Sequence, residues 1–245
     1  MYGVFSIILE WEIFHQWKSI LHIKKGYEYL VKDPIYNIMI TPGRPVKDVD
    51  ITKDSNTDNI FKELEQAGGF EARNVAEGVD ILYNMINDEK CTKFLSFIGA
   101  IVSTGFRGII RDMIKKKWCN VVITTCGALD HDIARHFSEY KEGSFTMDDR
   151  ELADQKIHRL GNVLVPMESY GPLIEEKVQE ILEKAYSEGK KEMSTIDINR
   201  ELGKAMGEDS FLYWAYKNDI PVVVPGIMDG AVGSQVWMFS QKHSD

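Results

Sequence analysis

The residues with the most chemical potential lie together between Val121 and Asp132, in the run VVITTCGALDHD. An apolar segment leads into hydroxyl and small side chains, and then into two acids that flank a histidine. This order predicts a buried strand over 120–125, a tight turn and a helix over 129–137. In α/β proteins ligands bind outside the carboxyl ends of parallel strands, so the turn is a predicted ligand site. Cys126 is a candidate nucleophile there, but we favour its interpretation as a small residue that fills the turn.

A second junction of the same kind is Val102-Ser103-Thr104-Gly105, between a predicted strand over 94–100 and a predicted helix over 106–117. Free N–H groups at a helix N-terminus bind anions, and glycine lets a ligand approach the backbone. Two such junctions on one sheet edge could hold the pyrophosphate of a dinucleotide. The G-x-G-x-x-G fingerprint is absent, so spacing alone favours ordinary helix caps over a dinucleotide site.

Asp130, His131 and Asp132 stand at the start of the predicted helix. Acids are favourable in a first helical turn, which is a sufficient reason for both aspartates. A histidine gains nothing from that position, so His131 with a neighbouring carboxylate is a candidate to bind an amine or move a proton. Asp229 follows another predicted strand, over 222–224, and would face the same sheet edge. An Asp-Gly pair is also a common turn, and the two interpretations carry equal weight.

Composition restricts the class of protein. The 245 residues carry 38 acidic and 29 basic side chains, a net charge of −9. This balance argues against a nucleic-acid-binding surface and favours cationic partners such as polyamines or basic loops. Three cysteines without paired spacing argue against disulfides and zinc, so we expect a reducing, cytoplasmic setting. The apolar N-terminus is too short to span a bilayer. We divide the chain into an N-terminal arm or start-site artefact, 1–38, and one domain, 39–245.

The rest of the chain alternates predicted helices with predicted strands. A further strand is expected over 163–165, the segment 138–156 is expected to be a polar connection, and another element is expected to begin near Val236. Further helices are predicted over 59–67, 72–87, 172–188, 195–206 and 210–218. Strands that alternate with helices of this length predict an α/β fold with a parallel sheet.

Several segments, in order along the chain, together resemble the deoxyhypusine synthase family in its archaeal form. The resemblance covers residues 40–245. The segments are GGFEA (68–72), VSTGFR (102–107), TTCGALDHD (124–132), HRLGNVLVP (158–166), YWA (213–215) and PGIMDGAVGS (225–234). It implies a Rossmann-like parallel sheet with helices on both faces, in which the C-terminal strands of the family fold are missing.

The family uses NAD to oxidise spermidine. It transfers the aminobutyl group, through an imine on an enzyme lysine, to one lysine of the translation initiation factor 5A precursor. The resemblance implies a cytoplasmic homotetramer and no metal. Asp130 and His131 stand where eukaryotic relatives have paired glutamates that hold the polyamine. The cofactor contacts that the resemblance implies are Ser103 and Thr104 at the first junction, Thr125, Cys126 and Gly127 at the second, and Asp229.

The chain departs from the family pattern toward its C-terminal end. The family's Lys-His-His, and the Trp-Gly-Lys whose lysine forms the imine, have no counterpart in this sequence. We therefore nominate no catalytic residue and expect the chain alone to be inactive. Ser234 also stands where eukaryotic members have a substrate-binding aspartate. The leading hypothesis is a deoxyhypusine synthase with a truncated or frameshifted sequence. The alternatives are an inactive partner subunit of a full-length synthase and a homospermidine synthase-like polyamine enzyme.

Overall fold

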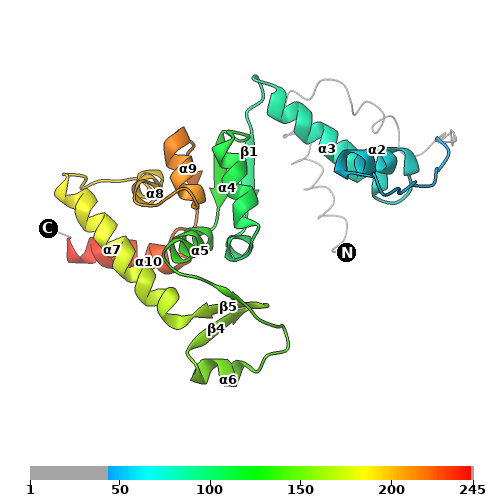
Figure 1. Cartoon of the computed structure of the whole chain (residues 1–245). Coiled ribbons are helices and arrows are strands. Elements are labelled where there is room, and N and C mark those ends of the chain that lie inside the picture. Colours follow the sequence, from blue (N-terminus) through cyan, green and yellow to red (C-terminus); the bar gives the residue numbers. More distant parts are fainter. Residues whose placement is uncertain (1–43, 244–245) are drawn as a thin grey trace, which may run out of the picture.

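The computed structural model describes residues 44–243 (Figure 1). The predicted N-terminal arm, 1–38, lies outside the described residues. Strands β1 (Phe94–Phe97), β2 (Val121–Thr124) and β6 (Val222–Val223) form a parallel sheet in the order β1-β2-β6. The predicted α/β class with a parallel sheet is confirmed, and the central position of β2 explains its apolar sequence. Val122, in the middle of β2, has no exposed surface.

The helices around the sheet pack in two groups. In one group α4 packs on α9 and α9 on α8, and in the other α7 packs on α10 and both contact α5. The buried core lies between these helices and the sheet, and its largest fully buried side chains include Leu129, Ile174, Leu202 and Phe211. The bounds are α4 (Arg107–Lys115), α5 (Cys126–Phe137), α7 (Gly171–Ser187), α8 (Thr195–Lys204), α9 (Phe211–Asn218) and α10 (Ala231–Lys242).

Two predicted boundaries on the ligand side of the sheet are wrong. The strand predicted over 94–100 ends at Phe97, and the 3-10 helix η1 (Gly99–Ser103) follows it. The helix predicted to start at Leu129 starts at Cys126, so Cys126 and Gly127 lie in its first turn and not in a turn before it. The two changed segments lie together, because η1 and the first turn of α5 pack closely on each other.

A second, antiparallel sheet stands where a polar connection and one more strand of the main sheet were predicted. Its order is β3-β5-β4, and β4 and β5 form a hairpin with the two-residue loop Gly161-Asn162. Arg159 in β4 forms an ion pair with Asp149 of the short helix α6. The elements of this unit are β3 (Lys141–Glu142), α6 (Asp149–Asp154), β4 (Ile157–Leu160), β5 (Val163–Pro166) and the 3-10 helix η2 (Met167–Ser169).

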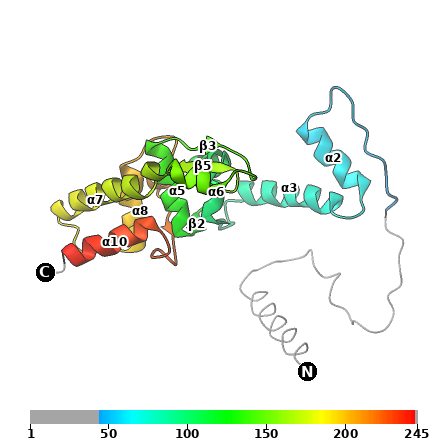
Figure 2. The ribbon, with the colours of Figure 1, turned by 90° about the horizontal axis from the view of Figure 1, so that it is seen from below.

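Helices α2 (Thr57–Ala67) and α3 (Ala72–Asn87) form a hairpin that precedes the sheet. The predicted bounds of α3 are confirmed, and α2 begins two residues earlier than predicted because the side chain of Asn56 caps it. The two helices pack against each other and lie to one side of the α/β body (Figures 1 and 2). Within residues 44–243, no helix combines the length and the apolar character that crossing a membrane requires.

Candidate functional site

A cavity of about 430 Å³ opens at the carboxyl edge of the parallel sheet. Strands β1 and β2 and the segment that follows β6 contribute to it, at the strand ends where ligands bind in open α/β sheets. The residues after β2 and β6 include the predicted site residues Thr125 and Asp229. The lining residues are Ser96, Phe97, Ile98, Ile123, Thr124, Thr125, Pro225, Gly226 and Asp229.

The ends of β1 and β2 are held together by threonine hydroxyls. The Thr124 hydroxyl donates to the carbonyl of Phe97 over 2.7 Å, and the Thr125 hydroxyl accepts the N–H of Gly99 over 2.9 Å. These bonds join β1 and the start of η1 to the end of β2. They fix the positions of the strand ends at the floor of the cavity, which is formed by the end of β1, the start of η1 and the end of β2.

Gly99 lets η1 approach the first turn of α5 at backbone distance. A Cβ atom at Gly99 would lie 2.6 Å from the amide nitrogen of Ala128 and 2.6 Å from the carbonyl carbon of Gly127. Such distances are far below van der Waals contact, so only glycine fits there. Gly127, a predicted cofactor residue, packs against Gly99 and does not line the cavity.

Asp229 brings a carboxylate to the lining of the cavity. It ends a turn in which its N–H donates to the carbonyl of Gly226 over 3.0 Å, and it precedes α10 by two residues. Among the predicted cofactor residues, Thr125 and Asp229 are the two that line the cavity. The interpretation of Asp229 as a residue that faces the sheet edge therefore fits the geometry, and so does its place in a turn.

Ser103 and Thr104 lie away from the cavity. The Ser103 hydroxyl donates to the carbonyl of Ala100 over 2.7 Å, and the Thr104 hydroxyl donates to that of Ile101 over 2.8 Å. Ser103 is buried, and neither residue lines the cavity. In this structure both hydroxyls donate to carbonyls of η1, whereas α4 has Phe106 as its N-cap and no side-chain cap bond. The predicted cap of the following helix is therefore not formed by either hydroxyl.

Cys126 is fully buried at the start of α5. Burial, with a smaller contribution from the neighbouring Asp130 carboxylate, raises the pKa of its thiol to about 12. A thiolate is the nucleophilic form of cysteine, and this site suppresses it. The interpretation of Cys126 as a small structural residue fits the structure better than that of a nucleophile.

The side chains of Asp130 and His131 contact different partners, and both lie outside the lining of the cavity. The Asp130 carboxylate is almost fully buried. The His131 Nδ1 lies 3.0 Å from the Tyr140 hydroxyl, and its ring also packs near Tyr170. Burial lowers the pKa of His131, against a smaller opposing contribution from Asp130. His131 is therefore a neutral imidazole at neutral pH, which is the form that can accept a proton.

The depressed pKa of His131 predicts a loss of stability in acid. In the unfolded chain this histidine binds its proton near its ordinary pKa of 6.5, whereas the folded protein resists protonation until a lower pH. The unfolding free energy should therefore fall as the pH drops below 6.5, because the unfolded state binds more protons. Denaturant titrations of the native chain and His131→Gln from pH 7.5 to 5 check this. The gap in stability between the two should shrink toward pH 5, and a constant gap would contradict it.

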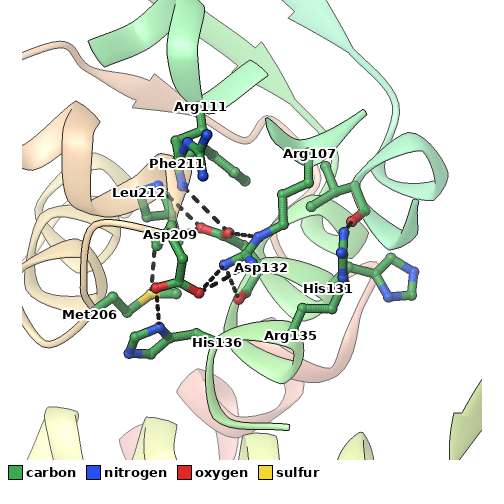
Figure 3. Close-up of polar contacts among 12 residues, drawn as sticks. Arg107, Arg111, His131, Asp132, Arg135, His136, Met206, Asp209, Phe211 and Leu212 are labelled. Carbon is green, nitrogen blue, oxygen red and sulfur yellow. Dashed lines mark hydrogen bonds and ion pairs between the residues drawn. The ribbon is translucent and has the colours of Figure 1, made fainter. Parts of the chain in front are cut away.

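Asp132 belongs to a separate buried ion-pair cluster, which Figure 3 shows on the side of α5 away from His131. Its carboxylate accepts the Arg107 Nε–H over 2.6 Å and the Ser210 hydroxyl over 2.7 Å. It also accepts the N–H of Leu212, in the first turn of α9. Asp209 completes the cluster by bonding Arg107 and His136. The cluster joins α4, α5 and α9 and has a structural role.

Sequence reasoning missed the tyrosines and the strand-end residues of the site. Tyr140 and Tyr170 lie in the connection after α5 and before α7, and each bonds a predicted polyamine residue. No local pattern marks them, because each partner lies at least nine residues away in sequence. Ser96 and Gly226 had a usable signal, since small or polar residues at the ends of predicted strands face the ligand edge.

Comparisons with known proteins give a consistent result. The family model for deoxyhypusine synthase matches residues 59–245. A "Probable deoxyhypusine synthase" of Thermoplasma acidophilum is 49% identical over 203 residues, and that of Thermoplasma volcanium is 50% identical over 203 residues. Each alignment covers 82% of this chain, and the chain spans 65% of the length of each relative. A crystal structure from Entamoeba histolytica assigned to the same enzyme family aligns with a TM-score of 0.55 at 18% identity. That alignment covers 80% of this chain and 67% of the other, and it supports the fold.

Proposed function

The chain belongs to the deoxyhypusine synthase family, and we propose that its sheet-edge cavity binds NAD for the oxidation of spermidine and aminobutyl transfer to the translation initiation factor 5A precursor. The observation that carries the proposal is the position of Thr125 and Asp229. Both line one cavity at the carboxyl edge of a parallel sheet, and both lie in segments that match the family. We further propose a cytoplasmic homo-oligomer, the tetramer of the resemblance.

The residues at the cavity fit a dinucleotide. Helix α5 begins directly after the cavity residue Thr125, and the N–H groups at a helix N-terminus attract phosphate groups. Thr125 and Asp229 supply polar side chains to the lining of the cavity. Bound there, NAD would accept the hydride that leaves the carbon atom next to the amine nitrogen. The chain's own residues would hold the cofactor and exclude water from it.

The polyamine would bind near His131. In the tautomer whose Nδ1–H donates to the Tyr140 hydroxyl, the Nε2 of its neutral imidazole can accept a hydrogen bond or a proton from an ammonium group. Burial also raises the pKa of Tyr140, so that its hydroxyl stays neutral beside the imidazole. The net charge of −9 favours the approach of a polycation.

In the family, the imine forms on an enzyme lysine. Among the described residues, the nine that line the cavity include no lysine. This favours a second candidate, in which the chain is a cofactor-binding partner subunit of a complete synthase. Mixing the chain with a complete synthase and measuring activity separates the two: a gain on mixing supports the partner subunit, and activity of the chain alone supports the enzyme. Homospermidine formation from putrescine would indicate the third alternative.

Asp229→Asn should weaken NAD binding about tenfold, the size of one hydrogen bond to a charged group. Isothermal titration of NAD into the folded protein measures it. Glu151→Gln is the matched control, because Glu151 lines a different, smaller cavity beside β4 and β5. The control should bind NAD as the native chain does. Equal affinities in all three proteins would remove Asp229 from the cofactor site.

A further inference from the structure

Asp130 makes contacts that do not suit a polyamine ligand. Its side chain is 1% exposed and lies between α5 and α10. One carboxylate oxygen accepts the Tyr170 hydroxyl over 2.8 Å and the N–H of Ala231 over 3.0 Å. The other accepts the N–H of Val232 over 2.9 Å and lies 3.8 Å from the Cys126 sulfur. These four donors occupy the carboxylate and leave it closed to a substrate ammonium group.

The N-terminus of α10 depends on this carboxylate. Gly230 is its N-cap and has no side chain, so the first N–H groups of the helix need acceptors from elsewhere. Asp130 accepts the first two of these N–H groups, those of Ala231 and Val232. Its negative charge also complements the positive end of the helix dipole. Burial, and then the Asp130 carboxylate, raises the pKa of Tyr170, so that the tyrosine remains a donor to Asp130.

Gly230 allows α10 to reach this position. A Cβ atom there would lie 2.7 Å from the Asp130 carboxylate and 2.7 Å from the Cys126 sulfur. Asp229, directly before it, lines the cavity. The contact between α5 and α10 thus sets the position of Asp229 at the cavity. Thr125, the second predicted cofactor residue that lines the cavity, is the N-cap of the same α5.

We propose that Asp130 is a positioning residue, which holds the start of α10 against α5 and thereby places Asp229 at the NAD cavity, and that it does not contact the polyamine. The proposal rests on the proposed cofactor site for its consequence, but the contact itself is independent of any ligand. Tyr170 shares the role, because it donates to the same carboxylate.

Hydrogen exchange and NAD titration test the proposal on folded protein. In Asp130→Asn, the amides of Ala231 and Val232 should exchange about tenfold faster, and NAD should bind about tenfold more weakly. Tyr170→Phe should show the same pattern at roughly threefold, because it removes one of four donors and keeps the ring packing. Asp149→Asn, at an exposed aspartate of helix α6, should change neither measurement.

The outcomes separate the alternatives. A residue with a general structural role would lower the unfolding free energy and leave NAD affinity of the folded protein unchanged, which would overturn the proposal. Unchanged amide exchange rates at Ala231 and Val232 in both variants would also overturn it. A loss of spermidine binding with an unchanged affinity for NAD would do the same. If the native chain binds no NAD, the proposed function fails, and the exchange rates alone decide whether Asp130 holds α10.

Discussion

Asp132→Asn should lower the free energy of unfolding by about 3–5 kcal/mol, the cost of leaving a buried charge without its partner. The Asp132 side chain has no exposed surface, and that of Arg107 is 8% exposed. The amide would keep the shape of the carboxylate but not its charge. The remaining acidic partner of the guanidinium, Asp209, is about half exposed and lies 3.2 Å away. The substitution also weakens the cap of α9, because Asp132 accepts the Leu212 N–H.

Urea denaturation followed by circular dichroism measures this loss. Asp58→Asn is the matched control, because Asp58 and Lys62 form an ion pair of the same length, 2.6 Å, with both side chains largely exposed. Solvent screening makes exposed pairs contribute little, so the control should keep the native urea midpoint within experimental error. If the two substitutions shifted the midpoint equally, burial would not decide the contribution of the Arg107–Asp132 pair.

The main sheet could be predicted because its strands carry strong local signals. The apolar run before Thr124 is the central strand β2, and the segment at Val222 is its neighbour β6. The hairpin of β4 and β5 was assigned wrongly although its loop, Gly161-Asn162, is typical of two-residue hairpin turns. The alternation of helices and strands suggested a parallel role for β5. Only the pairing, which depends on contacts with β3 and β4, shows the antiparallel sheet.

Candidate site residues could be predicted where a local sequence pattern marks them. Interactions were missed where the two partners lie far apart in the sequence. Thr125 and Asp229 follow buried strands, and both line the cavity. The first-turn interpretation of Asp132 gave no reason to expect Arg107 and Ser210 as partners, since they lie 25 and 78 residues away in sequence. Asp130 has the same local pattern as Asp132, yet it holds a different helix. A helix start alone does not show which of its acids serves a ligand.

Gly99→Ala should both destabilise the protein and weaken NAD binding. The new methyl group would meet backbone atoms of Gly127 and Ala128 at 2.6 Å, and backbone cannot move aside as a flexible side chain can. Overpacking costs about 1–3 kcal/mol and occasionally more. Relief requires η1 and α5 to separate, which stretches the bond from the Gly99 N–H to the Thr125 hydroxyl. The cavity floor then moves relative to the wall that carries Asp229.

Gly108→Ala is the control that isolates the contact from the loss of a glycine. Gly108 lies in the first turn of α4, and within 4 Å a Cβ there would approach the flexible guanidinium of Arg111, at 3.9 Å. Alanine is favoured over glycine in a helix by at most about 1 kcal/mol, and by less in a first turn, so this variant should unfold at slightly higher urea and bind NAD normally. We therefore expect Gly99→Ala to lower the free energy of unfolding and Gly108→Ala to raise it. If Gly99→Ala matched the native protein in both stability and affinity, η1 would not be packed on α5 at backbone distance. The close approach would then not be what shapes the cavity.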